Sequence, residues 1–252
     1  MMNASKAPSP STINEGEIEK FSALAAQWWD PHGPMAPLHR LGPARMGYIR
    51  DAACAHFGRD TGQLRPLKGL TALDVGCGAG IVTESLARMG ATATGLDASA
   101  DAVAAGRVHA EESGLAIDYR ADTAESLAEE GRRFDLITAL EVVEHVADVD
   151  LFLGALSRLL APGGLLVFST PNRTPQSYLS VIVAAERVLH WVPEGTHDWK
   201  AFLTPEELTC KLAQAGLHVT DLKGLSYSLV NRTFSVTRDT SINYIGTAVA
   251  KP

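Results

Sequence analysis

Three glycines and one aspartate have the types and spacing of a nucleoside site. The apolar stretch LDVGCGAG (residues 73–80) runs into Gly76, Gly78 and Gly80, and a helical pattern follows it. Glycine adopts backbone dihedrals closed to other residues and lets a ligand approach the main chain. Asp97 ends the next apolar stretch, close to the separation of about 20 residues at which a carboxylate meets ribose hydroxyls. The combination predicts a bound nucleoside rather than a tight turn with a helix cap.

The glycine spacing narrows the kind of nucleoside. The glycines follow GxGxG and not GxGxxG, so the helix N-terminus is not clearly placed for a pyrophosphate. Asp74 lies just before the loop, where its charge would oppose a phosphate. A nicotinamide-dependent enzyme, which would prefer GxGxxG, is therefore the weaker interpretation.

A second group of chemically capable residues follows a later apolar stretch. In LEVVEHV, Glu141, Glu144 and His145 would share one face if the segment were helical. Two carboxylates and an imidazole could then bind a divalent metal such as Mg²⁺, which lowers the pKa of a bound oxygen. Alternatively, His145 with Glu144 acts as a base without metal, or the two only orient one another at a solvated helix start. His197 is a second candidate base, although an isolated histidine is more often structural.

These residues must be positioned by strands that alternate with helices. Such alternation implies parallel βαβ crossovers and an α/β fold with a doubly wound sheet, whose ligands bind at the carboxyl ends of the strands. We expect strands near residues 70–76, 92–97, 116–120, 134–140 and 164–170, with helices at 80–89, 100–112, near 124, and at 149–160.

The flanking regions define a three-part organisation. Residues 1–13 are rich in Ser, Pro and Ala and are expected to form a disordered tail. Residues 14–69 should form an N-terminal helical cap, with helices from about 14 to Trp29 and from 43 to 57. Residues 70–252 should form the main domain, with a helix capped by Thr204 and strand-like stretches after it.

Composition excludes several classes of protein. The 252 residues carry 29 acidic and 22 basic side chains and a net charge of −7, which argues against nucleic acid as the main partner. The three cysteines form no CxxC pair, so neither a disulfide framework nor a structural zinc site is indicated. No secretory signal and no apolar run of 18 residues occurs.

The motifs of the main domain resemble those of class I S-adenosylmethionine-dependent methyltransferases. LDVGCGAG resembles their first motif, GLD (95–97) the acid of the second strand, and LLAPGGLLVFST (159–170) a later glycine-bearing strand. The resemblance implies a Rossmann-like, mostly parallel sheet of seven strands, with N-terminal helices, an inserted helical lid, and S-adenosyl-L-methionine as the cofactor.

Other segments are similar to one narrower family, the ubiquinone biosynthesis O-methyltransferases. They cover residues 21–49, 140–146, 169–174 and 192–208, and include the WWD, PLHR and GTHDW elements. This resemblance implies methylation of a phenolic hydroxyl on polyprenyl hydroxyphenol and demethylubiquinol intermediates. Two alternatives stay open: a methyltransferase of the same fold acting on another small phenol or carboxylic acid, and a catalytically idle cofactor-binding protein.

The family resemblance also suggests roles for individual residues. Arg45 would pair with the methionine carboxylate, Gly76 would touch the cofactor through its main chain, and Asp97 would hold the ribose. Leu140 stands where family members can carry Met. Asp122 follows the third expected strand and could bond the adenine, or it could cap a helix over residues 123–128. Some eukaryotic members are described as metal-dependent, with ligands in the motif that here reads LEVVEHV.

Contact with a membrane is expected because a polyprenyl substrate resides there. Residues 173–195, within a lid at 173–200, combine apolar residues with Arg and Trp side chains suited to an interface, although a buried helix over the sheet is equally compatible. The resemblance implies a cytoplasmic or peripheral inner-membrane protein that works beside other enzymes of ubiquinone biosynthesis. Trp28 and Trp29 could cover the substrate or pack the cap.

Overall fold

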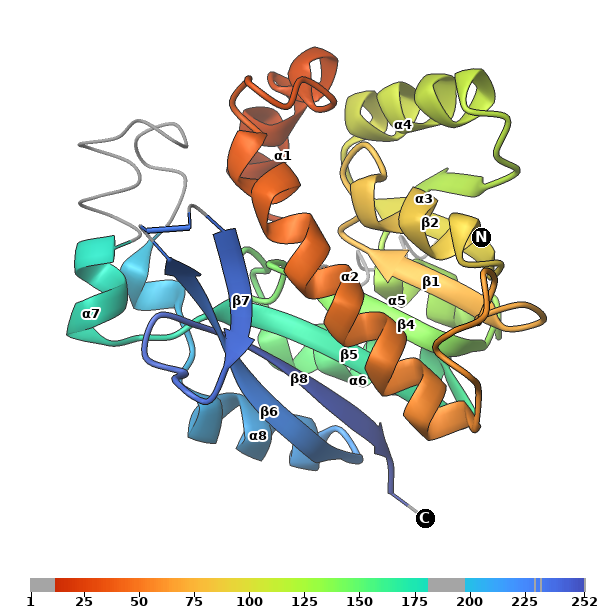
Figure 1. Ribbon diagram of the computed structural model, residues 1–252. Helices are drawn as coiled ribbons and strands as arrows, with labels where there is room; N and C mark the ends of the chain where they lie inside the picture. Colours follow the sequence, from red (N-terminus) through yellow and green to blue (C-terminus); the bar gives the residue numbers. More distant parts are fainter. Residues whose placement is uncertain (1–11, 181–197, 229, 232, 252) are drawn as a thin grey trace, which may run out of the picture.

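A single sheet of eight strands forms the centre of the computed structural model (Figure 1). The structure describes residues 12–180, 198–228, 230–231 and 233–251. The strand order is β3-β2-β1-β4-β5-β8-β6-β7. The strands are β1 (Thr71–Val75), β2 (Thr92–Asp97), β3 (Asp118–Ala121), β4 (Phe134–Leu140), β5 (Leu160–Pro171), β6 (Leu217–Ser228), β7 (Thr233–Thr237) and β8 (Asn243–Ala250).

The sheet combines a parallel half and an antiparallel half. The strands β1 to β5 pair in parallel, whereas β8, β6 and β7 are antiparallel to their neighbours. This confirms the doubly wound α/β prediction, but the expected number of seven strands is one too few. The additional strand β7 pairs only with β6, at the edge of the sheet. Its five residues are mostly exposed or half-buried, so no run of buried apolar residues announces it.

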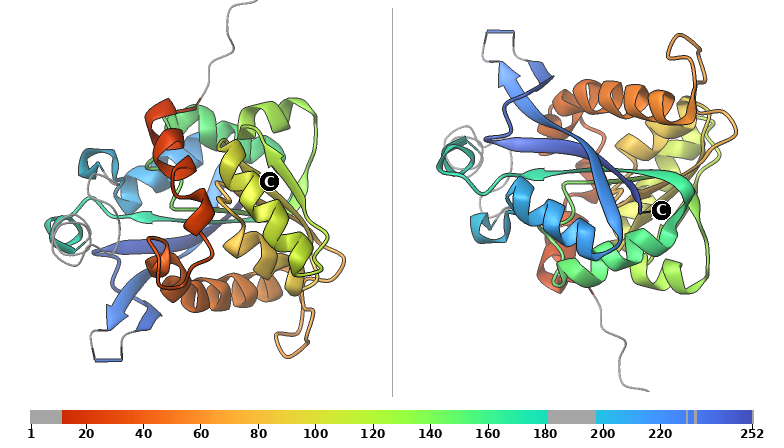
Figure 2. Two further views of the ribbon diagram at one scale, coloured as in Figure 1. Left: turned by 90° about the horizontal axis from the view of Figure 1, so that it is seen from above. Right: turned by 90° about the horizontal axis from the view of Figure 1, so that it is seen from below.

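Helices cover both faces of the sheet (Figure 2). One face packs against α5, α6 and α8, and the other against α2 and α3, so two apolar cores lie on opposite sides. The helices are α1 (Glu15–Ser22), η1 (Ala25–Gln27), α2 (Ala36–Phe57), α3 (Ile81–Arg88), α4 (Ala100–Glu112), α5 (Ala124–Glu129), α6 (Val149–Leu159), α7 (Pro175–Ser177), η3 (Trp199–Ala201) and α8 (Pro205–Gln214).

Local sequence signals account for most helix starts. The predicted Thr204 cap is confirmed, since its hydroxyl accepts from Glu207 N at 3.3 Å while Glu207 Oε2 accepts from Thr204 N at 2.9 Å. The helix α2 begins at Ala36, seven residues earlier than expected, and Pro43 lies inside it. Proline favours the first helical turn, which is why Pro43 indicated a start; Pro37 occupies that position instead.

The expected ends of the chain segments differ from the structure in one place. Thr12 belongs to the expected tail, yet it is buried, and its N–H donates to Glu125 Oε1 at 3.2 Å. The ordered cap therefore extends to Thr12, while residues 1–11 lie outside the described residues.

The predicted lid falls mostly outside the described residues. Only its flanks, α7 and η3, are described, and residues 181–197, with His197 among them, are not. The lid and the buried-helix alternatives therefore stay predictions. Within the part of the chain that the structure describes, no helix has the length and apolarity needed to cross a bilayer.

Candidate cofactor and active site

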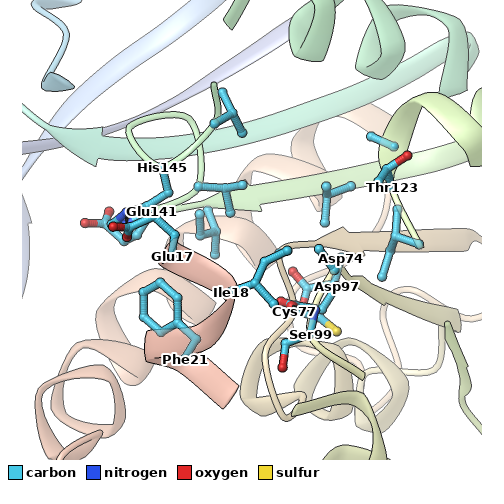
Figure 3. Close-up of a pocket in the computed structure, with 18 of the residues that line it drawn as sticks. Glu17, Ile18, Phe21, Asp74, Cys77, Asp97, Ser99, Thr123, Glu141 and His145 are labelled. Atoms are coloured by element: carbon cyan, nitrogen blue, oxygen red, sulfur yellow. Dashed lines mark hydrogen bonds and ion pairs between the residues drawn. The ribbon is translucent and has the colours of Figure 1, made fainter. Parts of the chain in front are cut away.

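A cavity of about 240 Å³ lies at the carboxyl ends of β1, β2 and β4 (Figure 3). The fold brings all five predicted cofactor residues to its wall, although they come from α2 and four different loops. They are Arg45, Gly76, Asp97, Asp122 and Leu140. The cavity therefore occupies the place at which ligands bind in open α/β sheets.

The glycine loop follows β1 as the spacing predicts, and two of its glycines are required sterically. Gly76 has a φ of +68°, and a Cβ there would lie 2.3 Å from Val142 Cγ2. Gly78 has a φ of +52°, and a Cβ there would lie 2.0 Å from the ring of Trp28. Any larger side chain would thus push neighbouring groups into the cavity or away from the loop.

Asp97 presents a carboxylate whose direction is fixed by the main chain. Its oxygens accept hydrogen bonds from Gly78 N at 2.8 Å and Ser99 N at 2.9 Å. Burial raises the pKa of Asp97, while these two N–H donors oppose the rise. Each oxygen has a further lone pair, so the carboxylate can accept two ribose hydroxyls from the cavity.

Asp74 lies beneath the loop and is almost completely buried. The hydroxyls of Thr83 and Thr138 each donate to it at 2.7 Å. Burial nevertheless raises the pKa of Asp74 to about 6, because desolvation disfavours the charged carboxylate. The group thus places partial negative charge under the cavity and opposes an anionic ligand.

Arg45 reaches the cavity from the buried face of α2. Its side chain is 5% exposed, and its Nη2 lies 2.8 Å from Glu141 Oε1. Among the described residues, Arg45 Nε has no hydrogen-bond partner. A buried guanidinium with an unused donor fits a carboxylate ligand, which guanidinium groups bind through paired hydrogen bonds.

Leu140 and Asp122 complete the set of predicted contacts. Leu140 ends β4 and adds apolar surface to the wall. The Asp122 carboxylate lines the cavity but accepts from Thr123 N at 2.8 Å and Ser126 Oγ at 3.1 Å. The cap of α5 is Thr123 rather than Asp122, so Asp122 supports that cap while its edge remains available to a ligand.

The segment LEVVEHV is not helical, so the expected shared helical face does not exist. It forms turns between β4 and α6, and Glu141 has a φ of +55°. This left-handed conformation costs energy for a residue with a Cβ. Hydrogen bonds to Glu141 from Ser169 Oγ at 2.7 Å and Asn243 Nδ2 at 2.9 Å hold it in place.

Glu144 and His145 lie side by side behind and beside the cavity. Glu144 is buried, accepts from Thr170 Oγ1 at 2.9 Å, and has its pKa raised by burial to about 7. Its Oε1 lies 3.9 Å from His145 Nε2. Burial alone would lower the pKa of His145, but Glu17, whose Oε2 lies 2.8 Å from Nδ1, raises it overall.

The three predicted metal ligands do not converge on one point. Within the described residues, no group of three acidic, His or Cys side chains is placed to hold an ion. Glu141 already accepts from Ser169 and Asn243 and pairs with Arg45, so it would have to exchange partners to join Glu144 and His145. The arrangement does not fit a ready-made metal site.

The helix α1 supplies cavity residues that the sequence did not reveal. Glu17, Ile18 and Phe21 point from it toward the cavity and His145 (Figure 3). The contact with His145 lowers the pKa of Glu17 to about 2, and Phe21 meets the His145 ring edge-on at 5.4 Å. The helical spacing indicated Ile18 and Phe21 as buried, but a charged neighbour at Glu17 was the only signal of a polar cavity.

Trp28 and Trp29 contact the glycine loop. Trp28 is 6% exposed and lines the cavity against Gly78. Trp29 Nε1 donates to Ala79 O at 3.0 Å. The two tryptophans therefore pack the cap onto the main domain, which is one of the two roles expected for them.

Charge in the cavity wall is mostly negative. Two of the charged residues in the wall carry basic groups, Arg45 and His145, and five carry acidic ones. The acidic residues are Glu17, Asp74, Asp97, Asp122 and Glu141. Such a wall favours a ligand that carries positive charge over a pyrophosphate.

Comparison with known proteins agrees with this geometry. Residues 46–222 match the family model described as a methyltransferase domain. The chain is 50% identical to the ubiquinone biosynthesis O-methyltransferase of Ruegeria pomeroyi, over 96% of this chain and 98% of that protein. It is 48% identical to the protein of the same name from Azorhizobium caulinodans, over 96% and 95% of the two chains. The chain belongs to the ubiquinone biosynthesis O-methyltransferase family.

Solved structures show the same fold at low identity. The magnesium protoporphyrin IX methyltransferase of Synechocystis, solved with bound SAH, superposes with a TM-score of 0.62 at 17% identity, covering 94% of this chain and 96% of that one. The PH0226 protein of Pyrococcus horikoshii gives 0.63 at 14% identity over 92% and 99%. Membership of the ubiquinone biosynthesis O-methyltransferase family and this fold confirm the predictions of a Rossmann-like methyltransferase and of an O-methyltransferase.

Proposed function

We propose that this O-methyltransferase moves a methyl group from S-adenosyl-L-methionine to a phenolic hydroxyl of polyprenyl hydroxyphenol and demethylubiquinol intermediates. The observation that carries the proposal is the acidic cavity at the strand ends, where Asp97 and the buried Arg45 face the same space. Its family supplies the class of acceptor.

Each residue of the wall has a distinct task in holding the cofactor. Asp97 accepts the ribose hydroxyls, Arg45 pairs with the methionine carboxylate, and Gly76 leaves room beside its main chain. The carboxylates of the wall favour a cation electrostatically. When bound, the cofactor supplies a methyl group already activated by the sulfonium.

His145 is the proposed acceptor of the phenol proton. A phenol titrates near 10, so removing its proton during transfer is a substantial part of the barrier. Glu17 lies against Nδ1, which assigns Nε2 as the atom that takes the proton. The buried Glu144 beside Nε2 stabilises the imidazolium that results. Replacing His145 with Ala should lower kcat by about a hundredfold, measured with saturating substrates.

Contact with the membrane is proposed for residues 173–195, which would place the enzyme at the cytoplasmic face of the inner membrane, beside other enzymes of the same pathway. At the described edge of this segment, Leu179 is 61% and Tyr178 39% exposed. Exposed apolar side chains of this kind insert into the interface. Leu179→Glu should reduce sedimentation with anionic liposomes, whereas Leu64→Glu, at a leucine 92% exposed elsewhere, should not. Equal sedimentation of both variants and wild type would remove the proposal.

The acceptor is tested by incubating the protein with methyl-labelled S-adenosyl-L-methionine and three acceptors. We expect the label to enter short-tail demethylubiquinol much faster than a soluble catechol or an aromatic carboxylic acid. Preference for the soluble catechol or the acid would support the alternative function, a methyltransferase for another small molecule. No transfer to any of the three would contradict the proposed chemistry.

A further inference from the structure

The N-terminal cap, residues 12–35, roofs the cavity through α1 and Trp28. A cofactor beneath this roof can leave only if the cap moves. The contacts that fix the cap therefore control cofactor exchange. One of them reaches beyond the cavity, through Trp29 to α4 and α3.

Trp29 ties the cap to two separate parts of the main domain. Its Nε1 donates to Ala79 O, in the glycine loop, at 3.0 Å. Its indole lies parallel to the imidazole of His109 on α4, with 3.5 Å between ring centroids and 5° between planes. A second cap-to-α4 contact joins Ser22 Oγ to Ser99 Oγ at 2.7 Å.

His109 is itself held in place by a buried carboxylate. Its Nδ1 lies 2.6 Å from Glu84 Oε1, and Glu84 on α3 has a side-chain exposure of 0%. Arg88 Nη2 lies 2.8 Å from the other oxygen of Glu84. A buried carboxylate is costly unless it is paired, so Glu84 fixes the orientation of the imidazole and turns its face to Trp29.

The placement of Trp29 determines the placement of Trp28. The two residues are adjacent, and the Trp28 ring lies so close to Gly78 that a Cβ there would be 2.0 Å away. The carbonyl of Trp28 also meets His39 Nε2 at 2.9 Å. A shift of Trp29 away from His109 would therefore lift Trp28 from the glycine loop and from the cavity wall.

We propose that Glu84, His109 and Trp29 form a latch that holds the cap closed over the bound cofactor. His109 and Glu84 do not line the cavity, so they act as positioning residues, through Trp29 and Trp28. The inference rests on the proposed function, because it requires the ligand of this cavity to be the cofactor.

The latch has a defined kinetic signature. When a closed state is favoured, loss of the latch lowers the fraction of closed protein and raises the apparent dissociation constant by the same factor. We expect His109→Ala to raise the dissociation constant for S-adenosylhomocysteine about tenfold, mainly through faster dissociation. The KM for S-adenosyl-L-methionine should rise similarly, while kcat stays within twofold, because the reacting groups are untouched.

The experiment compares His109→Ala, His109→Gln and His218→Ala with wild type. His109→Gln keeps a donor for Glu84 but loses the ring, so it separates cap closure from the burial of Glu84. His218 is an exposed histidine on β6 and serves as the matched control. Calorimetry gives the dissociation constants, release of labelled cofactor into excess unlabelled cofactor gives the rates, and thermal melting confirms folding.

The expected result is weaker binding and faster release in both His109 variants, with His218→Ala equal to wild type. Folded His109 variants whose affinity and release rate match wild type within twofold would overturn the latch but leave the proposed function intact. A wild-type protein that binds no S-adenosylhomocysteine would overturn both.

Discussion

Arg45 brings a buried positive charge to a cavity whose wall is otherwise mostly acidic. Its pairing with Glu141 at 2.8 Å leaves Nε without a hydrogen-bond partner among the described residues. That combination favours recognition of a carboxylate, and it distinguishes the amino-acid end of the cofactor from its adenosine end.

We expect Arg45→Gln to weaken S-adenosylhomocysteine binding by about 1.5–3 kcal/mol, the range for hydrogen bonds to a charged group. Binding of methylthioadenosine, which lacks the amino-acid end, should change little. Calorimetry with both ligands measures the difference. Arg50→Gln, at a partly exposed position on the same helix, is the control. Equal losses for the two ligands would show that Arg45 shapes the cavity rather than binding the carboxylate.

Asp74 predicts a pH dependence of stability with an unusual sign. Its pKa is about 6 in the folded protein, against an ordinary value of 3.8. The folded protein thus binds this proton more tightly than the unfolded chain does. The resulting stabilisation is fully present below pH 3.8 and is lost as the pH rises through 6. From the two pKa values it amounts to about 3 kcal/mol.

Asp74→Asn removes this titration. Relative to wild type, the unfolding free energy of the variant should therefore rise by about 3 kcal/mol between pH 4 and pH 7.5, measured by urea denaturation. Asp101→Asn, at an exposed position on α4, should show no such trend. A difference between Asp74→Asn and wild type that is independent of pH would contradict the assigned pKa.

At the residue level, the sequence predicted groups that act alone better than groups that act together. Gly76 and Asp97 follow from strand, loop and spacing, and the structure brings them to one cavity. Arg45 came only from family resemblance. The partners of Glu141 could not be predicted, because Ser169 and Asn243 reach it from β5 and β8, far along the chain.

Among the elements, the junction between cap and glycine loop is the most sensitive to shape. Gly78→Ala would introduce both a left-handed alanine and a clash with Trp28. Gly114→Ala would introduce a left-handed alanine, at a φ of +66°, with no atom within 4 Å. The two substitutions therefore separate backbone strain from displacement of the cap.

Both variants should lose about 1–2 kcal/mol of unfolding free energy from the unfavourable φ. Only Gly78→Ala should also lose more than about tenfold in S-adenosylhomocysteine affinity, the loss that follows if most of the protein is no longer closed. Denaturation and calorimetry on the same samples provide the two values. Similar affinities in the two variants would mean that Trp28 does not shape the cofactor site.

Elements with strong local signals were predicted well, and those defined by contacts were not. The helix over residues 100–112 and the Thr204 cap are as expected. LEVVEHV has helical spacing, yet tertiary contacts hold Glu141 in a left-handed conformation. The role of α1 depends on which face of the sheet the cap meets, and periodicity within one helix carries no such information.

For the whole molecule, alternating strands and helices were sufficient to predict the sheet and the edge that binds ligands. They could not predict β7, which is short and pairs only at the edge of the sheet. The closed cap adds a feature that no single segment encodes, since α1, α3, α4 and the glycine loop meet only in the folded chain.

The account depends most on a sulfonium nucleoside bound beside Asp97. Titration of S-adenosylhomocysteine into wild type and Asp97→Ala, with Asp101→Ala as the exposed control, tests it directly. We predict one site per chain in wild type, weakened by about 1.5–3 kcal/mol in Asp97→Ala and unchanged in the control. Absence of binding to wild type, or equal affinity in all three proteins, would contradict the account.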